Sequence, residues 1–380
     1  MARVGRATDG VPPRMNRIRM AVVGVGHLGK EHARVLASFP DVELVGVADV
    51  NDSQARAVAE RCGTQAFESH KDLFDLVDAV TIAAPTLYHH AIARSFLERG
   101  IPVLVEKPIT TTLAQAEELV EIATSQGVPF QVGHIERFNP AFEDLTRRPL
   151  TPKLIEAERH GPFTGRSTDI GAVLDLMIHD LDLILSLVRS PVRDVYALGA
   201  QVFGGHEDIV NARLLFENGC VASVTASRLS PRPKRKLRVW APEGYAGIDF
   251  VEKRLTLVQP SDEVRRHGLT QLHLDPTRRE QLSRDVFGKH MEVMELDCLR
   301  DHDQLTGELR HFIGCVRSGR LPRVTGEDGR DALALADRIL ASVQRHPWTE
   351  REDGPMGPKA MPAPLGKLFE PEQESGREAA

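Results

Sequence analysis

The sequence predicts an α/β protein of two domains: a doubly wound parallel sheet, then an α+β domain with a largely antiparallel open sheet. Two observations lead to this prediction. Residues 18–133 alternate short apolar runs with amphipathic segments, which is the spacing of strand–helix–strand units in a parallel sheet. After residue 137 consecutive strand-like runs are joined by "ENG" and "PEG" turns, which favours antiparallel neighbours. The 380 residues suffice for two such domains.

The elements of the first domain follow in order from these runs. Helices are expected after the first glycine turn to about residue 39, over 53–62, from about 89 to 99, and near 112–126. The strands between them are expected at "IRMAVVGVG" (18–26), "VELVGVAD" (42–49), "VDAVTIAAP" (77–85), "PVLVEKP" (102–108) and "PFQVGH" (129–134).

The second domain begins with a helix-like "PAFEDLTRR" (140–148) and a long apolar helix at 171–188. Alternating strands follow within 192–204, 209–230 and 234–260, and helices at 308–317 and 328–344 close the fold. The predicted division is a disordered leader (1–16), a nucleotide-binding domain (17–136), a substrate and oligomerisation domain (137–345) and a flexible tail (346–380). The open sheet face predicts a homodimer or homotetramer.

Composition excludes several classes of protein. The chain is 41% hydrophobic and 27% charged, with a net charge of −6, so it is not expected to bind nucleic acid. It has no apolar run of the roughly 20 residues that a membrane span needs, so no membrane association is expected. The four cysteines lack CxxC spacing, and the histidines lack the spacing of metal ligands. These features predict a cytoplasmic protein without a metal site.

A glycine turn marks the expected phosphate-binding site. "GVGHLG" spans Gly24, Gly26, His27, Leu28 and Gly29, between a strand and a helix, as a G-x-G-x-x-G dinucleotide site requires. The helix N-terminus offers free amides to a pyrophosphate. Asp49 ends the next strand, where an acid would accept hydrogen bonds from both ribose hydroxyls of NAD, which favours NAD over NADP. The alternative is a structural glycine turn.

Polar residues form a narrow stripe on the long apolar helix. Asp175, His179, Asp182 and Ser186 recur at i, i+4, i+7 and i+11, so they share one arc of the helix. An aspartate one turn before a histidine can orient the imidazole and raise its basicity, which suits a general base. A structural Asp–His pair at a domain interface explains the stripe equally well.

The run "VLVEKPIT" (103–110) ends a strand on Glu106 and Lys107, with Pro108 fixing the turn. The carboxyl end of a parallel strand is where open α/β sheets bind ligands. A lysine there can stabilise negative charge that develops on a reacting oxygen. The alternative is a charged strand end exposed to solvent.

Together the glycine turn, "EKP" and D-x-x-x-H-x-x-D resemble the glucose–fructose oxidoreductase / inositol dehydrogenase (Gfo/Idh/MocA) family, over about residues 17–345. "AAPTLYHHAIA" and "GEDGRDALALADRIL" are also similar to that family. The resemblance implies a Rossmann domain and an NAD-dependent dehydrogenase that acts on CH–OH groups. It implies that Lys107, Asp175 and His179 are catalytic. It further implies that cofactor contacts come from Pro85, Thr86, His89, Glu106 and Pro108.

Two further stretches, "VGHIERFNPAF" (132–142) and "VLDLMIHDLDLIL" (173–185), resemble the nucleotide-sugar branch, in particular UDP-N-acetylglucosamine 3-dehydrogenases. This implies oxidation at C3 of a lipid A or surface polysaccharide precursor, whose ketone a partner aminotransferase would use. A diphosphate needs cations, and Lys234 and Arg235 also lie in this domain. The expected substrate-binding residues are Arg137, Asn139, Arg159, Arg166, Asp182 and Arg228.

Alternatives remain for the function and for the cations. Each arginine could be an ordinary surface base, and "SPRPKRKLRV" could be an edge strand protected by charge. A dehydrogenase of a free polyol such as myo-inositol would have less use for the arginines. A non-catalytic NAD-binding sensor should lack the lysine or the histidine, and this chain has both.

Overall fold

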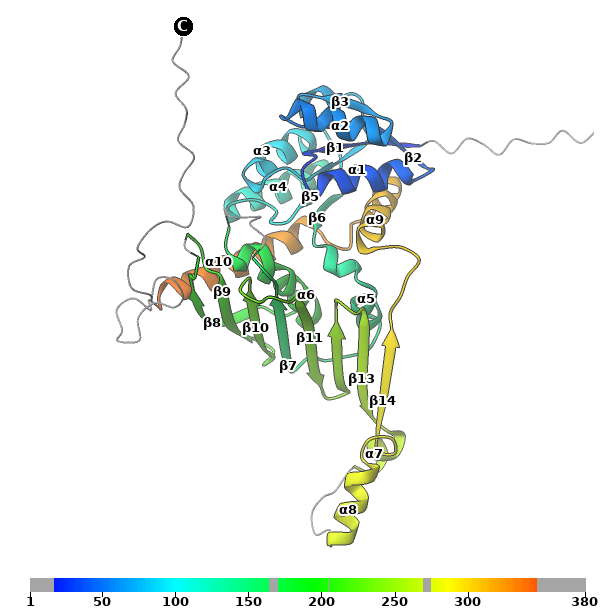
Figure 1. Cartoon of the computed structure of the whole chain (residues 1–380), viewed down its shortest axis with the longest axis vertical. Coiled ribbons are helices and arrows are strands. Elements are labelled where there is room, and N and C mark those ends of the chain that lie inside the picture. The colour runs from blue at the N-terminus through cyan, green and yellow to red at the C-terminus, as the bar shows by residue number, and fades with distance from the viewer. Residues whose placement is uncertain (1–16, 164–169, 204, 269–274, 347–380) are drawn as a thin grey trace, which may run out of the picture.

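The computed structural model describes residues 17–163, 170–203, 205–268 and 275–346. The predicted leader, and the predicted tail beyond His346, lie outside these residues. Two sheets organise the described chain, and Figure 1 shows one above the other. The parallel and antiparallel pattern predicted from the sequence is confirmed.

The first sheet has six parallel strands in the order β3-β2-β1-β4-β5-β6. The chain leaves β1 toward β2 and later returns to β4 on its other side, so β1 and β4 flank the switch point where doubly wound sheets bind ligands. The strands are β1 Ile18–Val23, β2 Val42–Ala48, β3 Gln65–Phe67, β4 Ala79–Ile82, β5 Val103–Glu106 and β6 Phe130–Gly133.

Helices cover both faces of this sheet, as the apolar strands require. One apolar cluster joins the sheet to α1 and α9, and another joins it to α3 and α4. The helices of this part are α1 Gly29–Ser38, α2 Asp52–Cys62, the 3₁₀ turn η1 His70–Leu73, α3 Thr86–Leu97 and α4 Leu113–Gln126. The C-terminal helix α9 (Gln304–Ser318) thus packs back onto the first sheet, where Leu309 and Phe312 are fully buried.

The second sheet has eight strands in the order β14-β13-β12-β11-β7-β10-β9-β8. All its pairs are antiparallel except β7 with β10. Strand β7 lies between β10 and β11, which run in opposite directions, so it must be parallel to one of them. The strands are β7 Leu154–His160, β8 Val192–Ala200, β9 Ile209–Phe216, β10 Val221–Ser227, β11 Lys234–Ala241, β12 Gly244–Asp249, β13 Arg254–Pro260 and β14 Met291–Asp297.

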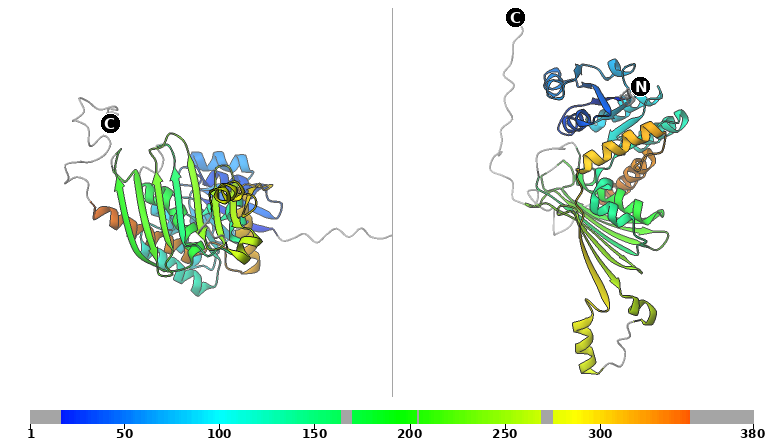
Figure 2. Two further views of the ribbon diagram at one scale, coloured as in Figure 1. Left: turned by 90° about the horizontal axis from the view of Figure 1, so that it is seen from below. Right: turned by 90° about the vertical axis from the view of Figure 1, so that its right-hand side faces the viewer.

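Helices lie on one face of this sheet, and Figure 2 shows that no described helix covers the other, bare face. The covered face packs against α5 (Pro140–Thr146), α6 (Ile178–Val188) and α10 (Gly326–Gln344). The 3₁₀ turn η2 (Ile135–Phe138) joins the two sheets, and the predicted domain boundary at residue 136 falls inside it.

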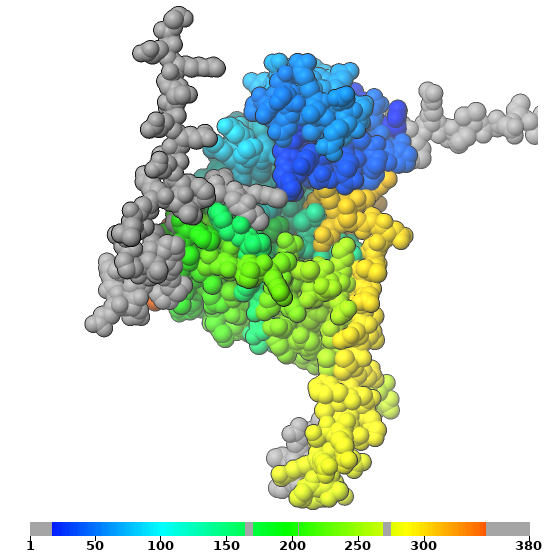
Figure 3. Space-filling view, in the orientation of Figure 1, coloured from blue at the N-terminus to red at the C-terminus, as the bar shows by residue number. Residues whose placement is uncertain are grey.

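The region between β13 and α9 was not assigned any element from the sequence. It holds α7 (Asp262–His267), α8 (Pro276–Asp285) and β14. Neither α7 nor α8 has a buried residue, so no apolar period marks them. The two helices form an arm that projects from the body of the molecule (Figure 3).

Candidate active site

The glycine turn after β1 has the geometry that a pyrophosphate site needs. Gly24 has a φ of +82°, and a Cβ there would lie 2.5 Å from the amide nitrogen of Ala84. A Cβ on Gly29 would lie 1.8 Å from the carbonyl oxygen of Gly24. No atom lies within 4 Å of a Cβ placed on Gly26, so this face of the turn is open to a ligand. His27 continues the turn, and Leu28, 46% exposed, occupies the N-cap of α1.

Asp49 is held beside this turn at the end of β2. Its Oδ2 accepts a hydrogen bond from the backbone N–H of Val25 at 2.8 Å, and Oδ1 accepts from that of Asn51 at 2.9 Å. Each carboxylate oxygen has a second lone pair. The acid is therefore fixed next to the glycine turn and can still accept from the hydroxyls of a ribose.

His89 connects two loops at the carboxyl edge of the sheet. It lies in α3, which begins at Thr86 after the exposed Pro85, and its ring is buried. Nδ1 lies 2.9 Å from the carbonyl oxygen of Pro108, and Nε2 lies 2.7 Å from that of Ala84. Burial lowers the pKa of His89, although both carbonyls favour the protonated ring. The histidine thus fixes the loop after β5 against the end of β4.

Glu106 anchors the same loop from the opposite face of the sheet. Its Oε1 lies 3.0 Å from Nε2 of His32 in α1, and its Oε2 accepts from the backbone N–H of Lys107 at 3.3 Å. Burial alone would raise the pKa of Glu106, but the hydrogen bond from His32 and nearby positive charge hold it below its ordinary value. The peptide bond between Lys107 and Pro108 is cis.

The side chain of Lys107, which follows β5 of the first sheet, reaches Asp175 in the second domain. Its ammonium donates to the carbonyl oxygen of Asp175 at 2.8 Å and to Oδ1 at 3.3 Å. The lysine side chain is 13% exposed and that of Asp175 is 29% exposed. The pair therefore lies in a sheltered position that a small ligand could still reach, and the structure brings these two predicted catalytic residues together.

The long apolar helix that carries the polar stripe differs from its sequence prediction. Its first turn is a π-helix, η3 (Val173–Met177), and only then does the α-helix α6 begin. A π turn inserts a residue into the helical repeat, so it breaks the regular arc on which the stripe was placed. In place of the expected hydrogen bond to His179, the Asp175 carboxylate pairs with Lys107, and Nδ1 of His179 has no hydrogen-bond partner among the described residues.

His179 is set up as a neutral imidazole. Burial, followed by the positive charges of Lys107 and Arg159, lowers the pKa of His179 well below its ordinary value. The ring of His134, at the end of β6, meets it edge to face with the centroids 6.4 Å apart. A neutral ring with a free nitrogen can accept a proton near pH 7.

The arginines expected to bind substrate are engaged inside the protein. Arg137 pairs with Asp182 through hydrogen bonds of 2.7 and 2.8 Å, so two predicted substrate residues bind each other. Arg159 pairs with Asp180 at 2.8 Å and with Glu136 at 2.9 Å. All three partnered carboxylates are buried. These guanidinium groups are therefore already paired with buried carboxylates of the protein.

The remaining predicted substrate residues have comparable roles or cannot be placed. Arg228 pairs with buried Asp208 at 2.5 Å and donates to the carbonyl oxygen of Ile170 at 3.1 Å. Asn139 caps α5, accepting from the N–H of Ala141 at 3.1 Å. Arg166 lies outside the described residues.

Two buried residues beside the site were not identified from the sequence. His134 has neither ring nitrogen hydrogen-bonded within the described chain. Its place at the carboxyl end of β6, next to β5, could have revealed it. Glu308 of α9 is fully buried with both oxygens unpaired among the described residues, and burial and then Glu106 raise its pKa well above the ordinary value. The helical repeat around Glu308 does not show that its carboxyl group is buried and unpaired.

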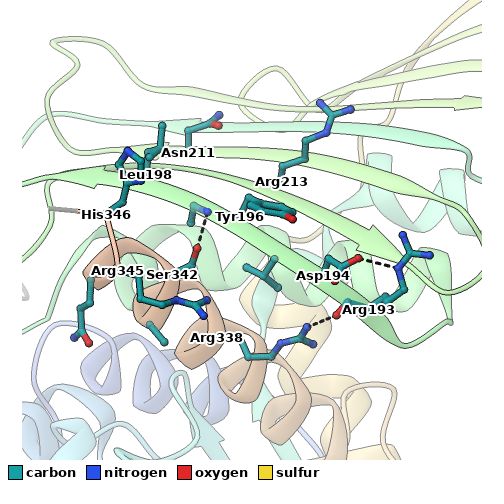
Figure 4. A pocket seen from close by; sticks show the side chains of 14 residues that line it. Arg193, Asp194, Tyr196, Leu198, Asn211, Arg213, Arg338, Ser342, Arg345 and His346 are labelled. Atoms are coloured by element: carbon teal, nitrogen blue, oxygen red, sulfur yellow. Dashed lines mark hydrogen bonds and ion pairs between the residues drawn. The ribbon is translucent and has the colours of Figure 1, made fainter. Parts of the chain in front are cut away.

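Figure 4 shows a groove of about 1100 Å³ that belongs to a different part of the molecule. Tyr196 and Arg213 of the bare sheet face line it, together with Arg338 and Ser342 of α10. It contains none of the predicted site residues. Within the described ranges no cluster of His, Cys, Asp or Glu is suited to a metal ion, and no helix there is long and apolar enough to cross a membrane.

The first domain carries a dinucleotide-binding turn, and its Lys107 lies near His179 of the second domain. Such a set of groups suits an NAD-binding dehydrogenase. Comparison with known families agrees. Residues 18–134 match the oxidoreductase family with an NAD-binding Rossmann fold, and residues 145–246 match the GFO/IDH/MocA C-terminal domain. The chain therefore belongs to the Gfo/Idh/MocA family of oxidoreductases, and the resemblance inferred from the motifs is confirmed.

Individual relatives are similar over nearly their whole length. The chain is 33% identical over 331 residues to a UDP-N-acetylglucosamine 3-dehydrogenase of Acidithiobacillus ferrooxidans, covering 87% of this chain and 98% of that protein. A solved structure of that enzyme superposes with a TM-score of 0.76, at 32% identity and the same coverage. A scyllo-inositol 2-dehydrogenase (NAD⁺) of Bacillus subtilis is 27% identical, covering 82% of this chain and 90% of the relative.

Proposed function

We propose that the protein oxidises a sugar hydroxyl to a ketone with NAD, at C3 of a UDP-N-acetylglucosamine-type nucleotide sugar. The observation that carries the proposal is the ion pair of Lys107 with Asp175 beside His179, whose pKa the charge of that lysine helps to lower. The choice of substrate rests on 33% identity to a UDP-N-acetylglucosamine 3-dehydrogenase over 98% of that enzyme.

The residues present suit NAD. Gly24 and Gly29 form the turn, Gly26 leaves room for the pyrophosphate, and Asp49 can accept from the ribose. When bound, NAD supplies the hydride acceptor at its nicotinamide ring.

The side chains of this protein would move the proton and stabilise charge. The Lys107 ammonium donates a hydrogen bond to the reacting oxygen and stabilises its developing alkoxide character. His179, neutral because of burial, accepts the hydroxyl proton. Asp175 holds the ammonium of Lys107 in place through its carbonyl and carboxylate oxygens. The product would be a 3-keto sugar, whose carbonyl is a substrate for an aminotransferase.

A substrate screen tests the proposal. Purified protein with NAD should produce NADH absorbance with UDP-N-acetylglucosamine, and the free sugar N-acetylglucosamine should be oxidised far less efficiently. Equal efficiency for the two would argue against a nucleotide-sugar enzyme.

A second candidate is a dehydrogenase of a free polyol such as myo-inositol. Two observations favour it: the similarity to an inositol dehydrogenase, and the internal pairing of Arg137, Arg159 and Arg228. Turnover of inositol but not of UDP-sugars in the same screen would select it. Absence of turnover with every sugar, despite tight NADH binding, would select a non-catalytic sensor.

Replacement of Lys107 by methionine tests the chemistry itself. Removing a preorganised charge from the reacting oxygen should lower kcat by about 100-fold or more, while NADH still binds. Lys71→Met, a change at an exposed lysine of η1, is the matched control and should leave kcat unchanged. A Lys107→Met enzyme with near-normal kcat would place the lysine outside the chemistry.

A further inference from the structure

The basic residues of β11 are Lys234, Arg235, Lys236 and Arg238. They point to different faces of the sheet because side chains alternate along a strand. Lys234 pairs with Glu158 at 2.8 Å, Lys236 with Asp249 at 3.2 Å, and Arg238 with Glu156 at 3.4 Å. These three side chains alternate with buried residues such as Leu237, so they lie on the bare face of the sheet. β11 lies between β7 and β12, so protection of an edge strand does not explain the run.

Arg235 points the other way, toward the domain junction. It lies directly opposite Arg159 in the β7–β11 register, and directly opposite residues share a face of the sheet. Its Nη1 lies 3.8 Å from Oε1 of Glu136, on the helix-covered side. It is therefore the member of the run that faces the candidate active site.

The guanidinium of Arg235 has donors to spare. Its side chain is 49% exposed, and no hydrogen bond joins that guanidinium to another described residue. Its ion pair with Glu136 is long, and Oε1 of Glu136 already accepts from Arg159 at 2.9 Å. A guanidinium carries five N–H donors, so a ligand can occupy them without breaking an internal bond.

The three described arginines that were predicted to bind substrate differ on this point. Side chains of Arg137, Arg159 and Arg228 are at most 10% exposed, and each is hydrogen-bonded to a buried carboxylate. If an anion captured one of them, a buried carboxylate would lose its partner, which is strongly destabilising. Arg235 carries no such cost.

Arg235 is also close to the proposed base. Arg159, its cross-strand neighbour, is hydrogen-bonded to Asp180, the residue next to His179. The positive charge of Arg235 contributes, after burial and after Lys107, Arg159 and His134, to the low pKa of His179. An anionic group bound by Arg235 would thus lie near the proposed base.

We propose that Arg235 is a specificity-determining residue that binds the diphosphate of a nucleotide-sugar substrate. The inference rests on the proposed function and adds the residue that recognises the nucleoside diphosphate. Guanidinium and phosphate form charge-assisted hydrogen bonds in matching geometry. Because the diphosphate does not react, its contact should stabilise ground and transition states alike and act mainly on KM.

The test compares Arg235→Ala with Arg238→Ala, an arginine of the same strand on the bare face. For Arg235→Ala, KM for UDP-N-acetylglucosamine and Kd for UDP measured by calorimetry should both rise about tenfold or more, with kcat within a few-fold of wild type. Arg235→Lys should recover part of the loss because it keeps the charge. Arg238→Ala should leave both constants unchanged, and NADH binding should be equal in all variants.

The outcomes separate this inference from the proposed function. If wild type oxidises UDP-N-acetylglucosamine and Arg235→Ala leaves KM and the UDP Kd unchanged, the role of Arg235 is overturned and the function stands. If Arg235→Ala and Arg238→Ala weaken UDP binding equally, a general charge effect replaces the specific contact. If wild type neither binds UDP nor oxidises the nucleotide sugar, the proposed function is overturned, and the inference with it.

Discussion

The pairing of Asp175 with Lys107 changes the role expected for this acid. From the sequence it was assigned to His179, one helical turn away, but its oxygens hold the ammonium that would contact the reacting hydroxyl. The basicity of His179 is therefore governed by burial and by nearby cations rather than by a carboxylate. These two causes act in the same direction, because both disfavour the imidazolium.

The pH profile of kcat/KM should reflect this environment. A base must be deprotonated to act, and the pKa of His179 lies well below its ordinary value, so the acidic limb should fall well below the pH of an unperturbed histidine, which is about 6.5. His179→Ala should lose about 10²- to 10⁴-fold in rate and abolish that limb. An acidic limb at or above pH 6.5 in the wild-type profile would contradict the assignment.

Asp49 should decide between the two nicotinamide cofactors. Its carboxylate is fixed beside the glycine turn by the N–H of Val25, so a 2′-phosphate there would meet a like charge. We expect kcat/KM to favour NAD over NADP by about 100-fold, since a like-charge contact costs several kcal/mol. Asp49→Ser should narrow the gap, and Asp52→Ser, at the exposed start of α2, should not. Equal use of both cofactors by wild type would refute the expectation.

At the scale of elements, substitution of an outer glycine of the turn should affect stability, whereas substitution of the middle glycine should affect cofactor binding. A Cβ on Gly29 meets the Gly24 carbonyl at 1.8 Å, whereas one on Gly26 meets nothing in the protein. Gly29→Ala should therefore lower stability by about 1–3 kcal/mol, the usual cost of overpacking. Gly26→Ala should keep the wild-type Tm and lose NADH affinity, because the methyl group enters the space for the pyrophosphate. Equal Tm losses for both would contradict this reading of the turn.

Elements with a strong local signal were predicted, and those without one were not. The glycine turn and the carboxyl ends of β2 and β5 were located because strand, turn and helix signals coincide there. In contrast, α8 has no buried residue and no apolar period marks it, and the apolar residues of β14 do not keep a regular alternation. The π turn at Val173–Met177 also has no signal in the sequence, because its residues continue the apolar repeat of α6.

Candidate site residues divide in the same way, into those with a local sequence signal and those without one. Lys107, Gly26 and Asp49 could be selected as candidates from the sequence because their positions depend on local turns and strand ends, and their roles stay predictions. The pairing of Arg137, Arg159 and Arg228 has no signal in the sequence because their partners are distant along the chain: Arg159 meets Asp180 only when β7 and α6 pack together. A free surface arginine and a buried, paired one look alike in sequence, and only tertiary contacts separate them.

At the scale of the whole molecule, the bare sheet face and the arm are the features from which we expect an assembly. Residues on the bare face alternate with buried ones along strands such as β9 and β10, so a full side of the sheet has no covering layer within the described chain. The ten-residue helix α8 buries no side chain, and isolated helices of that length are marginal in water. Exposed Phe287, Val293 and Met294 lie at the base of this arm. Both features gain stability if another copy of the chain covers them.

We therefore expect a homodimer or homotetramer in solution. Sedimentation velocity at micromolar concentration should give a mass two or four times that of the chain, and Tm should rise with protein concentration because association stabilises the folded state. Val293→Glu, on the exposed β14, should shift the distribution toward smaller species, because a charge would be buried at an apolar contact. Glu292→Lys, on the same strand, is a control for charge change alone. A monomer at every concentration would show that the bare face and the arm are stable on their own.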